Sequence, residues 1–541
     1  MRKDLAGFSA LEEKFQVGCI QPLTSTCVIG KARKTVENEF FRVETFIPSY
    51  APENTIRGHF EFGLKYDDLN FEWLSRFFAY GNPKWIVDWL KDQPSSIYAR
   101  KTAFLYEWFC KELPDDAKTT ATIYEDALDS KKYLTSTSPI RNKRWKITDN
   151  FPGTRYFCPL VRLNSKLKES LDFDITEDLN DLDEKFGADL LMRSAAWLTF
   201  NESRASFLIE KEQDKKDDIR RFASAMTIYC GKIDDPLSDQ SLVTLQNEIL
   251  GKRSLRTGIR KSPVFVGSAA HHDVTVVHYI APSSDQIKNL MDGLRNFESK
   301  TRYLKDDQIL SKSAHAIVRA SSISFSFVYI HPFSDGNGRV HRLLVNDTLL
   351  RDGVVPQGVI LPISSTIVRS STRRGGYQNV LDSLSKRFMH HYNTEYNFAK
   401  TVVCEDGVTT DFKFNCYDDA LPFWRYQDLT SHCAYMAEVI KTTVRENMTN
   451  EAQFLALHDE AKKRLKQVFE MPDIDADAIV RSLRENKYAI TNTLKHKYPT
   501  IFADKDITNE VVEAIASALE QREIKSDFDP STENKQPDFG F

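Results

Sequence analysis

The amino-acid sequence predicts a mainly α-helical protein built from more than one folded unit. Its 541 residues are 41% hydrophobic and 28% charged, which is enough apolar material for a sizeable core. Only 21 residues are glycine, and runs that alternate apolar and polar residues are few. Longer stretches repeat apolar residues at helical spacing and are separated by short loops. This composition excludes a collagen-like, low-complexity or wholly disordered chain.

The first segment, residues 1–189, is expected to be a mixed unit with an aromatic-rich helical part. Trp85 and Trp89 lie four residues apart, and a second aromatic stripe runs through residues 99–114. Apolar aromatics at this spacing are usually buried, so we expect a core here and give less weight to a platform for stacking bases. Residues 114–152 are polar and rich in turn formers, which predicts a long connection across the surface.

Residues 190–400 alternate long helical patterns with short loops. Helices are predicted over residues 242–251, 284–297 and 311–330. A pair of short strands, marked by glycine and proline, is predicted over residues 257–267. This segment is therefore expected to be a helical core that carries one β-hairpin.

The remainder, residues 401–541, is also predicted to be helical. Ile479 and Leu483 fall on one helical face, and a second apolar stripe follows near the C-terminal end. Residues 501–541 hold ten acidic residues against four basic ones. About the last fifteen residues are polar enough to fray.

Charge and targeting signals limit the classes of protein that fit. The 73 basic and 77 acidic residues nearly cancel, so no overall field draws the chain to nucleic acid or to an anionic membrane. The uncharged stretch at residues 321–330 is about half as long as a transmembrane helix. The first residues carry acids and lack the apolar core of a secretory signal, so we expect a cytoplasmic protein. Eight scattered cysteines form no C-x-x-C pair, which predicts reduced thiols rather than a zinc site or disulfides.

One window, HPFSDGNGRVHR at residues 331–342, stands apart chemically. It lies between two apolar helical stretches, so it forms a loop that leads into a helix. Its Gly-Asn-Gly run lets successive backbone N–H groups turn toward one point, which makes an anion-binding nest at a helix N-terminus. Asp335 can hold Mg²⁺ against phosphate oxygens, two arginines can reach anionic oxygens, and His331 can accept a proton. Each residue alone has an ordinary structural explanation, but the set is complete for phosphoryl or nucleotidyl transfer.

The same window resembles the signature of the Fic family, H-x-F-x-[D/E]-G-N-G-R-x-x-R, at all eight constrained positions. The resemblance implies a Fic-type helical core over residues 190–400, between an N-terminal associated domain and a C-terminal helical domain with a polar tail. It also implies transfer of AMP from ATP to a protein hydroxyl, with Mg²⁺ as cofactor, His331 as general base and Asp335 as metal ligand. The implied phosphate-binding residues are Gly336, Asn337, Gly338, Arg339 and Arg342.

Upstream, residues 203–212 resemble the inhibitory helix of this family, [S/T]-x-x-x-E-[G/N]. The implied inhibitory residues are Ser206 and Glu210, and Glu210 would pair with Arg342 in the space that the γ-phosphate needs. Lys211 departs from the pattern, because the family has Gly or Asn there. A glutamate in a solvated, charge-rich stretch is the alternative interpretation.

Two further parts of the site rest on the same resemblance. The strand pair at residues 257–267 looks like the family's flap, whose edge would bind the main chain of the target, and an ordinary surface hairpin is the alternative. The implied target-binding residues are Arg260, Lys261, Ser262, Pro263 and Val264. The adenine side is expected near Tyr377, Gln378 and Leu381, where this chain has Tyr followed by Gln in place of the family's paired tyrosines.

The sequence thus predicts a Mg²⁺-dependent protein adenylyltransferase restrained by Glu210. The two loop glycines favour AMP transfer over the γ-phosphate transfer of Doc-type relatives, which have Ala and Lys in this loop. AMP removal, or transfer of another phosphate-linked group such as phosphocholine, stays open within the same enzyme class. A helical regulator that binds DNA or a protein partner is the alternative of another class, although the C-terminal segment lacks a basic stripe. The expected partner is a protein with a Tyr, Thr or Ser hydroxyl. Self-modification and oligomer formation stay open, and neither a membrane nor nucleic acid is expected.

Overall fold

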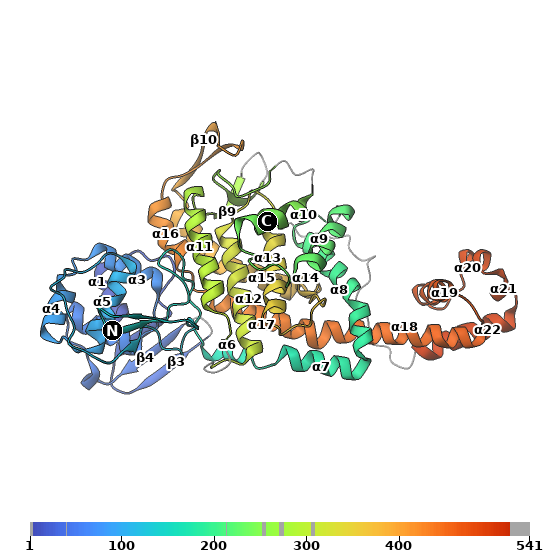
Figure 1. Cartoon of the computed structure of the whole chain (residues 1–541), viewed down its shortest axis with the longest axis horizontal. Coiled ribbons are helices and arrows are strands. Elements are labelled where there is room, and N and C mark those ends of the chain that lie inside the picture. The colour runs from blue at the N-terminus through green and yellow to red at the C-terminus, as the bar shows by residue number, and fades with distance from the viewer. Residues whose placement is uncertain are drawn as a thin grey trace.

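A computed structural model describes residues 4–38, 41–212, 214–251, 256–269, 275–303 and 309–519 of the chain. Three parts follow one another along the sequence: an N-terminal unit, a central helical unit and a C-terminal arm of helices (Figure 1). The protein is mainly helical, as the sequence predicts. No helix among the described residues is both long and apolar enough to cross a membrane.

The N-terminal unit packs a small sheet against helices. Its four strands are β1 (Asp4–Ala6), β2 (Ser25–Ile29), β3 (Lys34–Glu37) and β4 (Arg42–Phe46), in the order β1-β2-β4-β3. Its helices are α1 (Phe8–Phe15), η1 (Pro48–Tyr50), α2 (Ile56–Tyr66), α3 (Phe71–Tyr80), α4 (Lys84–Asp92) and α5 (Ile97–Phe109). Trp89 is buried and Trp85 packs against the same aromatic core, so the aromatic stripes form a core and not an open stacking platform.

Residues 114–152 do not form the long surface connection that the sequence predicts. They contain a small sheet of β5 (Glu125–Asp126), β6 (Ile140–Asn142) and β7 (Ile147–Asp149), in the order β5-β7-β6. Trp145 and Phe151 are fully buried, and the Trp145 Nε1–H donates to Glu107 Oε2 at 2.6 Å. Isolated apolar residues between turn formers give no periodic hydrophobic pattern in the sequence. Trp145 and Phe151 are nevertheless large enough to join the core of the N-terminal unit.

The central unit is built around one buried helix, α12 (Lys312–Ile330), against which α13 (Asn337–Arg351) packs (Figure 1). Its other helices are α6 (Ser165–Ser170), α7 (Ile175–Phe186), α8 (Ala188–Ile209), α9 (Lys216–Tyr229), α10 (Asp239–Leu250), α11 (Ser284–Lys300), α14 (Ile363–Val368) and α15 (Ser371–Tyr392). The three helices predicted within residues 242–330 are confirmed as α10, α11 and α12. Because α12 is buried on nearly every side, the loop at its C-terminal end is held by the core.

The hairpin of the central unit lies further along the chain than predicted. Strands β8 (Phe265–Ala269) and β9 (Thr275–Ile280) pair in antiparallel register, whereas most of residues 257–264 form an irregular segment. That segment is tied down instead, since Ile259 forms a bridge with Phe333 and Arg260 is buried. The glycine and proline that suggested a turn belong to this tied segment and not to the hairpin.

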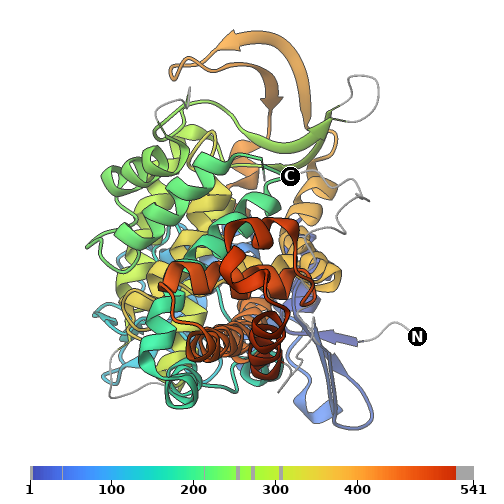
Figure 2. The same ribbon diagram turned by 90° about the vertical axis from the view of Figure 1, so that its right-hand side faces the viewer.

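The segment after residue 400 is not wholly helical, which corrects the prediction. A second hairpin of β10 (Tyr396–Val403) and β11 (Thr409–Phe414) opens it (Figure 2). Phe265 of β8 contacts the rings of Phe398 and Phe412. Aromatic and β-branched residues favour strands here. The helices that follow are α16 (Tyr417–Arg425), α17 (Thr430–Thr442), a π-helical turn η2 (Thr443–Met448), α18 (Thr449–Val468), α19 (Asp473–Glu485), α20 (Asn492–Lys497), α21 (Pro499–Phe502) and α22 (Lys505–Leu519).

The C-terminal arm has a core of its own. Helix α18 starts against the central unit and extends away from it, and α19 to α22 gather at its far end (Figure 1). The side chains of Ile479, Leu483, Val511 and Ile515 are fully buried there, as their spacing predicts. All eight cysteines of the chain are free thiols.

Candidate active site

His331 ends helix α12 in the left-handed conformation, with φ 53° and ψ 58°. Its backbone N–H donates to the Phe327 carbonyl at 2.9 Å, and its ring Nδ1 lies 3.1 Å from the Val328 carbonyl. Because a carbonyl oxygen only accepts, Nδ1 must carry the proton and Nε2 holds the free lone pair. Burial and, to a smaller extent, the nearby positive charge of Arg260 together lower the pKa of His331 to about 4. The ring is therefore neutral at physiological pH and has Nε2 available as a base.

The loop after His331 is fixed by its own side chains. Phe333 is fully buried, as expected. The Asn337 amide bonds Phe333 twice: Oδ1 accepts from its N–H at 3.0 Å, and Nδ2 donates to its carbonyl at 2.8 Å. From outside the loop, Gln246 of α10 donates to the Asp335 carbonyl at 2.9 Å. The Asn337 side chain is thus occupied within the loop, which leaves only its backbone N–H for a phosphate.

Arg260 has a structural position that the sequence does not predict. It is 2% exposed and donates to three carbonyl oxygens, those of His331 at 2.7 Å, Ser262 at 2.9 Å and Pro282 at 2.6 Å. Burial lowers the pKa of Arg260 to about 10, which still leaves the guanidinium charged at neutral pH. Arg260 therefore joins the base of the hairpin to the His331 loop.

The predicted target-binding set must be corrected accordingly. Arg260 and Ser262 are buried, so their side chains do not reach a target. Lys261 is exposed but engaged, because its N–H donates to Asp406 at 2.8 Å and its Nζ lies 3.2 Å from Glu405. Pro263 and Val264, also in that set, are half-buried. The edge of a sheet, the feature on which the flap prediction rested, belongs to β8 and β9.

Helix α13 begins directly at the Gly-Asn-Gly run. Gly336 caps it with φ 91°, a conformation that only glycine adopts freely. The first N–H groups of a helix have no acceptor within that helix, and its N-terminus is positive. A Cβ atom added to Gly338 would lie 2.1 Å from Glu210 Oε1, so glycine is what lets a carboxylate approach this point. An anion can therefore sit where the predicted phosphate site lies.

Two acidic side chains after α8 engage the two arginines of α13. Arg342 lies 2.5 Å from Glu210 Oε1, and its Nε donates to Ser206 Oγ at 2.6 Å. Arg339 Nη1 lies 3.2 Å from Glu212 Oε2, and its Nη2 lies 3.0 Å from Asp335 Oδ1. Burial lowers the pKa of Arg342, but the charge of Glu210 opposes that effect and the net shift is upward. The pairing expected between Glu210 and Arg342 is present, and Glu212 is a partner that the sequence gave no reason to expect.

The residues predicted for the adenine side lie in different surroundings. Tyr377 is 8% exposed, and burial raises its pKa while the nearby charge of Arg342 lowers it. Gln378 donates to Asp382 at 2.8 Å, and the Leu381 carbonyl accepts from the Tyr329 hydroxyl at 3.1 Å. Tyr377 is thus close to Arg342, and contact of Tyr377, Gln378 or Leu381 with a base stays a prediction.

Asp335 fits the usual manner in which proteins hold Mg²⁺. Its carboxylate is 60% exposed at the N-terminal end of α13, beside the anion position. Mg²⁺ at nucleotide sites commonly takes one or two carboxylates and completes its shell with phosphate oxygens and water. Among the residues that the structure describes, no group of three or more His, Cys, Asp and Glu could hold a metal without a substrate. A metal here would depend on nucleotide phosphates.

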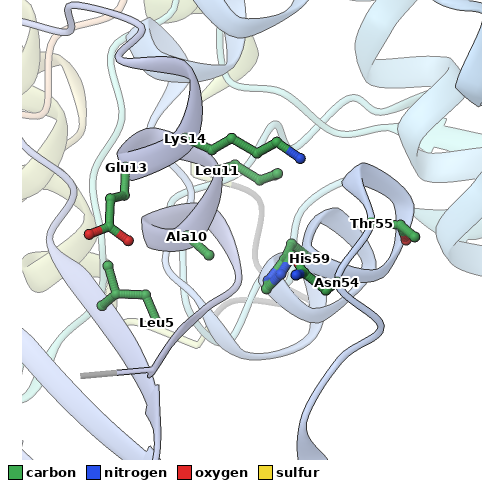
Figure 3. Close-up of a pocket in the computed structure, with 8 residues that line it drawn as sticks. All are labelled: Leu5, Ala10, Leu11, Glu13, Lys14, Asn54, Thr55 and His59. Carbon is green, nitrogen blue, oxygen red and sulfur yellow. The ribbon is translucent and has the colours of Figure 1, made fainter. Parts of the chain in front are cut away.

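A separate hollow of about 230 Å³ lies in the N-terminal unit between α1 and α2 (Figure 3). It is lined by Leu5, Ala10, Leu11, Glu13, Lys14, Asn54, Thr55 and His59. Burial lowers the pKa of His59, so this imidazole is neutral. The hollow contains none of the residues of the His331 loop.

Comparison with known proteins finds similarity in the central unit. Residues 236–349 match the model of the Fic/DOC family. The chain is 33% identical over 131 residues to the protein adenylyltransferase Fic of Drosophila melanogaster, which is 24% of this chain and 23% of that protein. It is 34% identical over 94 residues to the protein of the same name from Nematostella vectensis, which is 17% of this chain and 20% of that protein. The match therefore spans less than a quarter of the length of these relatives.

Two solved structures align with part of this chain. A Fic family protein from Desulfovibrio desulfuricans G20 aligns with a TM-score of 0.35 and 15% identity, over 57% of this chain and 82% of that one. A Fic domain containing signaling protein from Bacteroides thetaiotaomicron VPI-5482 aligns with a TM-score of 0.25 and 20% identity, over 52% of this chain and 93% of that one.

Proposed function

We propose, from the Fic/DOC family domain at residues 236–349, that this protein is a nucleotidyltransferase that moves AMP from ATP to a hydroxyl of a protein. The observation that carries the proposal is the juxtaposition of a neutral imidazole with an anion-binding helix N-terminus. His331 ends one helix and α13 starts six residues later, so a base and a phosphate site share one fixed loop. The curated relatives that match this region are named protein adenylyltransferases, which supports AMP as the group transferred.

His331 would act as the general base. Its Nε2 takes the proton from the target hydroxyl, whose oxygen then bonds to the α-phosphorus of ATP while the bond to the β-phosphate breaks. The hydrogen bond from Nδ1 to the Val328 carbonyl keeps Nε2 unprotonated and also supports the imidazolium that forms. A positioned base of this kind typically contributes ~10²–10⁴-fold to the rate.

The anion site would hold the phosphates and stabilise the departing pyrophosphate. Charge develops on the leaving group, so fixed donors there lower the barrier more than they strengthen binding of ATP. The first-turn N–H groups of α13 and the guanidinium groups of Arg339 and Arg342 are held in place by burial and by hydrogen bonds. Mg²⁺ bound at Asp335 would neutralise charge on the phosphate oxygens.

Glu210 would restrain this reaction. Its carboxylate contacts Arg342, the cation proposed for the outer phosphates, and lies against Gly338 at the start of α13. A γ-phosphate cannot share that position, because both groups are anionic and need the same guanidinium. ATP binding in the productive pose would therefore require Glu210 to leave.

Transfer of labelled phosphate from ATP tests the proposal. The full-length protein, its E210G variant and the double variant E210G/H331A are incubated with Mg²⁺, a cell lysate as a mixture of acceptors, and ATP labelled at either the α or the γ position. We expect α-label on protein, more with E210G than with wild type, and none with the double variant. Transfer of γ-label alone would indicate a kinase, and no transfer by E210G would contradict the proposal.

A further inference from the structure

Three side chains on α8 and its C-terminal cap recur at intervals of four residues. They are Glu202, Ser206 and Glu210, and residues at this spacing share one face of a helix. Ser206 and Glu210 contact Arg342 of α13. Glu202, one turn earlier, has no part in the reaction described above, although it is a fully buried carboxylate.

Glu202 is bound to the start of α14. Its Oε2 accepts from the Ser364 backbone N–H at 2.6 Å, and its Oε1 accepts from the Ser364 hydroxyl at 2.5 Å. Burial raises the pKa of Glu202 to about 7, while these bonds and the charge of Arg342 oppose that rise. An acidic side chain without such partners would not remain in a core, so the pair with Ser364 is a specific tie between α8 and α14.

The tie to α14 differs from the other polar contacts of the same helix. Ser203 donates to the Ile219 carbonyl, which fastens α8 to α9 on its other side. Thr199 donates to the Ala195 carbonyl, which lies within α8 itself. Glu202 is therefore a polar anchor of α8 toward α14, one turn before the residues that hold Arg342.

We propose that Glu202 is a positioning residue that holds the C-terminal end of α8 where Glu210 can occupy Arg342. This inference rests on the proposed function, because it assigns a cause to the inhibition proposed for Glu210. When Glu202 loses its bonds to Ser364, α8 can turn or shift away from α14 and carry Glu210 off the guanidinium. Glu202 acts through Glu210 and touches neither nucleotide nor target.

Polar contacts also connect α14 to the π-helical turn η2, where the C-terminal arm begins. Thr366 Oγ1 lies 2.7 Å from Thr443 Oγ1 of the π-helical turn η2, and Arg369 donates to Asn447 Oδ1 of the same turn at 2.7 Å. Thr366, Thr443 and Asn447 are buried, Arg369 is exposed, and η2 is the root of the C-terminal arm. The anchor of the inhibitory helix and the attachment of the arm thus share helix α14.

Binding of Mg²⁺·ATP, measured by isothermal titration calorimetry, tests this role without knowledge of the target. Glu202→Leu removes both hydrogen bonds and puts an apolar side chain in the same buried position. We expect it to tighten ATP binding about tenfold, toward the affinity of Glu210→Gly. A tenfold change corresponds to about 1.4 kcal/mol, which is about the contribution of one charge-assisted hydrogen bond. Without the bonds to Ser364, Glu210 leaves the Arg342 guanidinium more readily and the phosphates of ATP can bind there. Glu202→Gln should stay within about twofold of wild type, because its amide can accept from the Ser364 N–H and donate to the hydroxyl.

Two further variants separate the role from a general loss of structure. Thr199→Val removes a buried bond that stays within α8 and should leave ATP affinity unchanged. In the Glu202→Leu/Glu210→Gly double variant, the first substitution should add nothing to the second, because Glu202 acts only through Glu210. If Glu202→Leu does not fold, Ser364→Ala removes one of the two bonds and should tighten binding about threefold.

The outcomes distinguish the two proposals. If Glu210→Gly tightens ATP binding but neither Glu202→Leu nor Ser364→Ala does, the role of Glu202 is wrong and inhibition by Glu210 stands. Equal tightening by Glu202→Leu in the wild-type and Glu210→Gly backgrounds would also overturn it. If Glu210→Gly itself leaves ATP affinity unchanged, the proposed inhibition fails first, and with it the premise of the inference.

Discussion

The chemistry of this site depends on residues whose side chains are held before any substrate arrives. His331 owes its tautomer to one backbone carbonyl and its low pKa to burial beside Arg260. Arg342 owes its position to Ser206 and Glu210. A base that is already neutral and a cation that is already oriented reduce the reorganisation that the reaction needs.

The pKa of His331 predicts how activity depends on pH. Since its pKa is about 4 in the folded protein, the imidazole stays unprotonated well below its reference value of about 6.5. The kcat/KM of Glu210→Gly for α-label transfer should therefore hold between about pH 7 and 6 and fall only nearer pH 4. The unfolded chain takes up this proton near pH 6.5, so His331 also lowers stability progressively as the pH falls from about 6.5 to about 4. A pH–rate profile with its acid midpoint at about 6.5 would contradict the assignment.

At the residue scale, the sequence predicts the functional residues of the loop but not the residues from other elements that hold the loop in place. The residues of the loop are contiguous, so their chemistry is visible in one window of sequence. Gln246, Glu212 and Tyr377 reach the site from other elements, and a single glutamine or glutamate in a helical pattern gives no sign of the residue it contacts. Arg260 was placed on the target side because residues 257–267 resemble the flap of the Fic family, and only the fold shows that three carbonyls surround it.

At the scale of elements, one buried arginine connects the hairpin to the catalytic loop. Arg260 precedes β8, while the carbonyls that it binds belong to the loop after α12, to its own segment and to the residues after β9. The hairpin and the loop should therefore move together. Phe265 at the start of β8 extends the same block to β10 and β11 through its ring contacts.

Replacement of Arg260 should disturb both stability and catalysis. Arg260→Met leaves three carbonyl oxygens without their charged donor, so we expect a loss of about 3 kcal/mol in the free energy of unfolding. Because His331 is then held less firmly, transfer of α-label by the Glu210→Gly variant should fall at least about tenfold. Denaturant unfolding and the labelling assay measure the two effects. Lys261→Met, at the exposed neighbouring position, is the matched control, and equal effects of the two substitutions would argue against this link.

Helices with a strong apolar period were predicted correctly, and strands were not. The pattern over residues 311–330 identifies α12 because its length and period leave no competing structure. The hairpin was placed too early because glycine and proline mark turns without saying which side the strands occupy. Strands β10 and β11 were missed because a short alternating run next to helical patterns depends for stability on its pairing strand and on packing, here on ring contacts with Phe265 of β8.

At the scale of the whole molecule, regulation and stability are divided among the three parts. The N-terminal unit joins the rest of the protein through contacts such as the ion pair of the buried Arg76 with Asp419 of α16, whose Nη1 and Oδ1 atoms are 3.2 Å apart. The arm is attached differently, because α18 alone leads out to α19 to α22 (Figure 1). Parts with separate cores and a narrow connection unfold separately, so the chain should depart from two-state behaviour.

A cavity in the core of the arm should therefore affect the arm alone. Ile479 is fully buried in that core, and Ile→Ala at such a site costs about 2–5 kcal/mol. In differential scanning calorimetry, Ile479→Ala should lower the first unfolding transition and leave the later transition of the central unit in place. Ile474, on the same helix and 79% exposed, provides the control, since Ile474→Ala should shift neither transition. A single transition that moves as a whole in Ile479→Ala would show that the arm unfolds together with the catalytic unit, and the shared helix α14 would then connect them more strongly than its few polar contacts suggest.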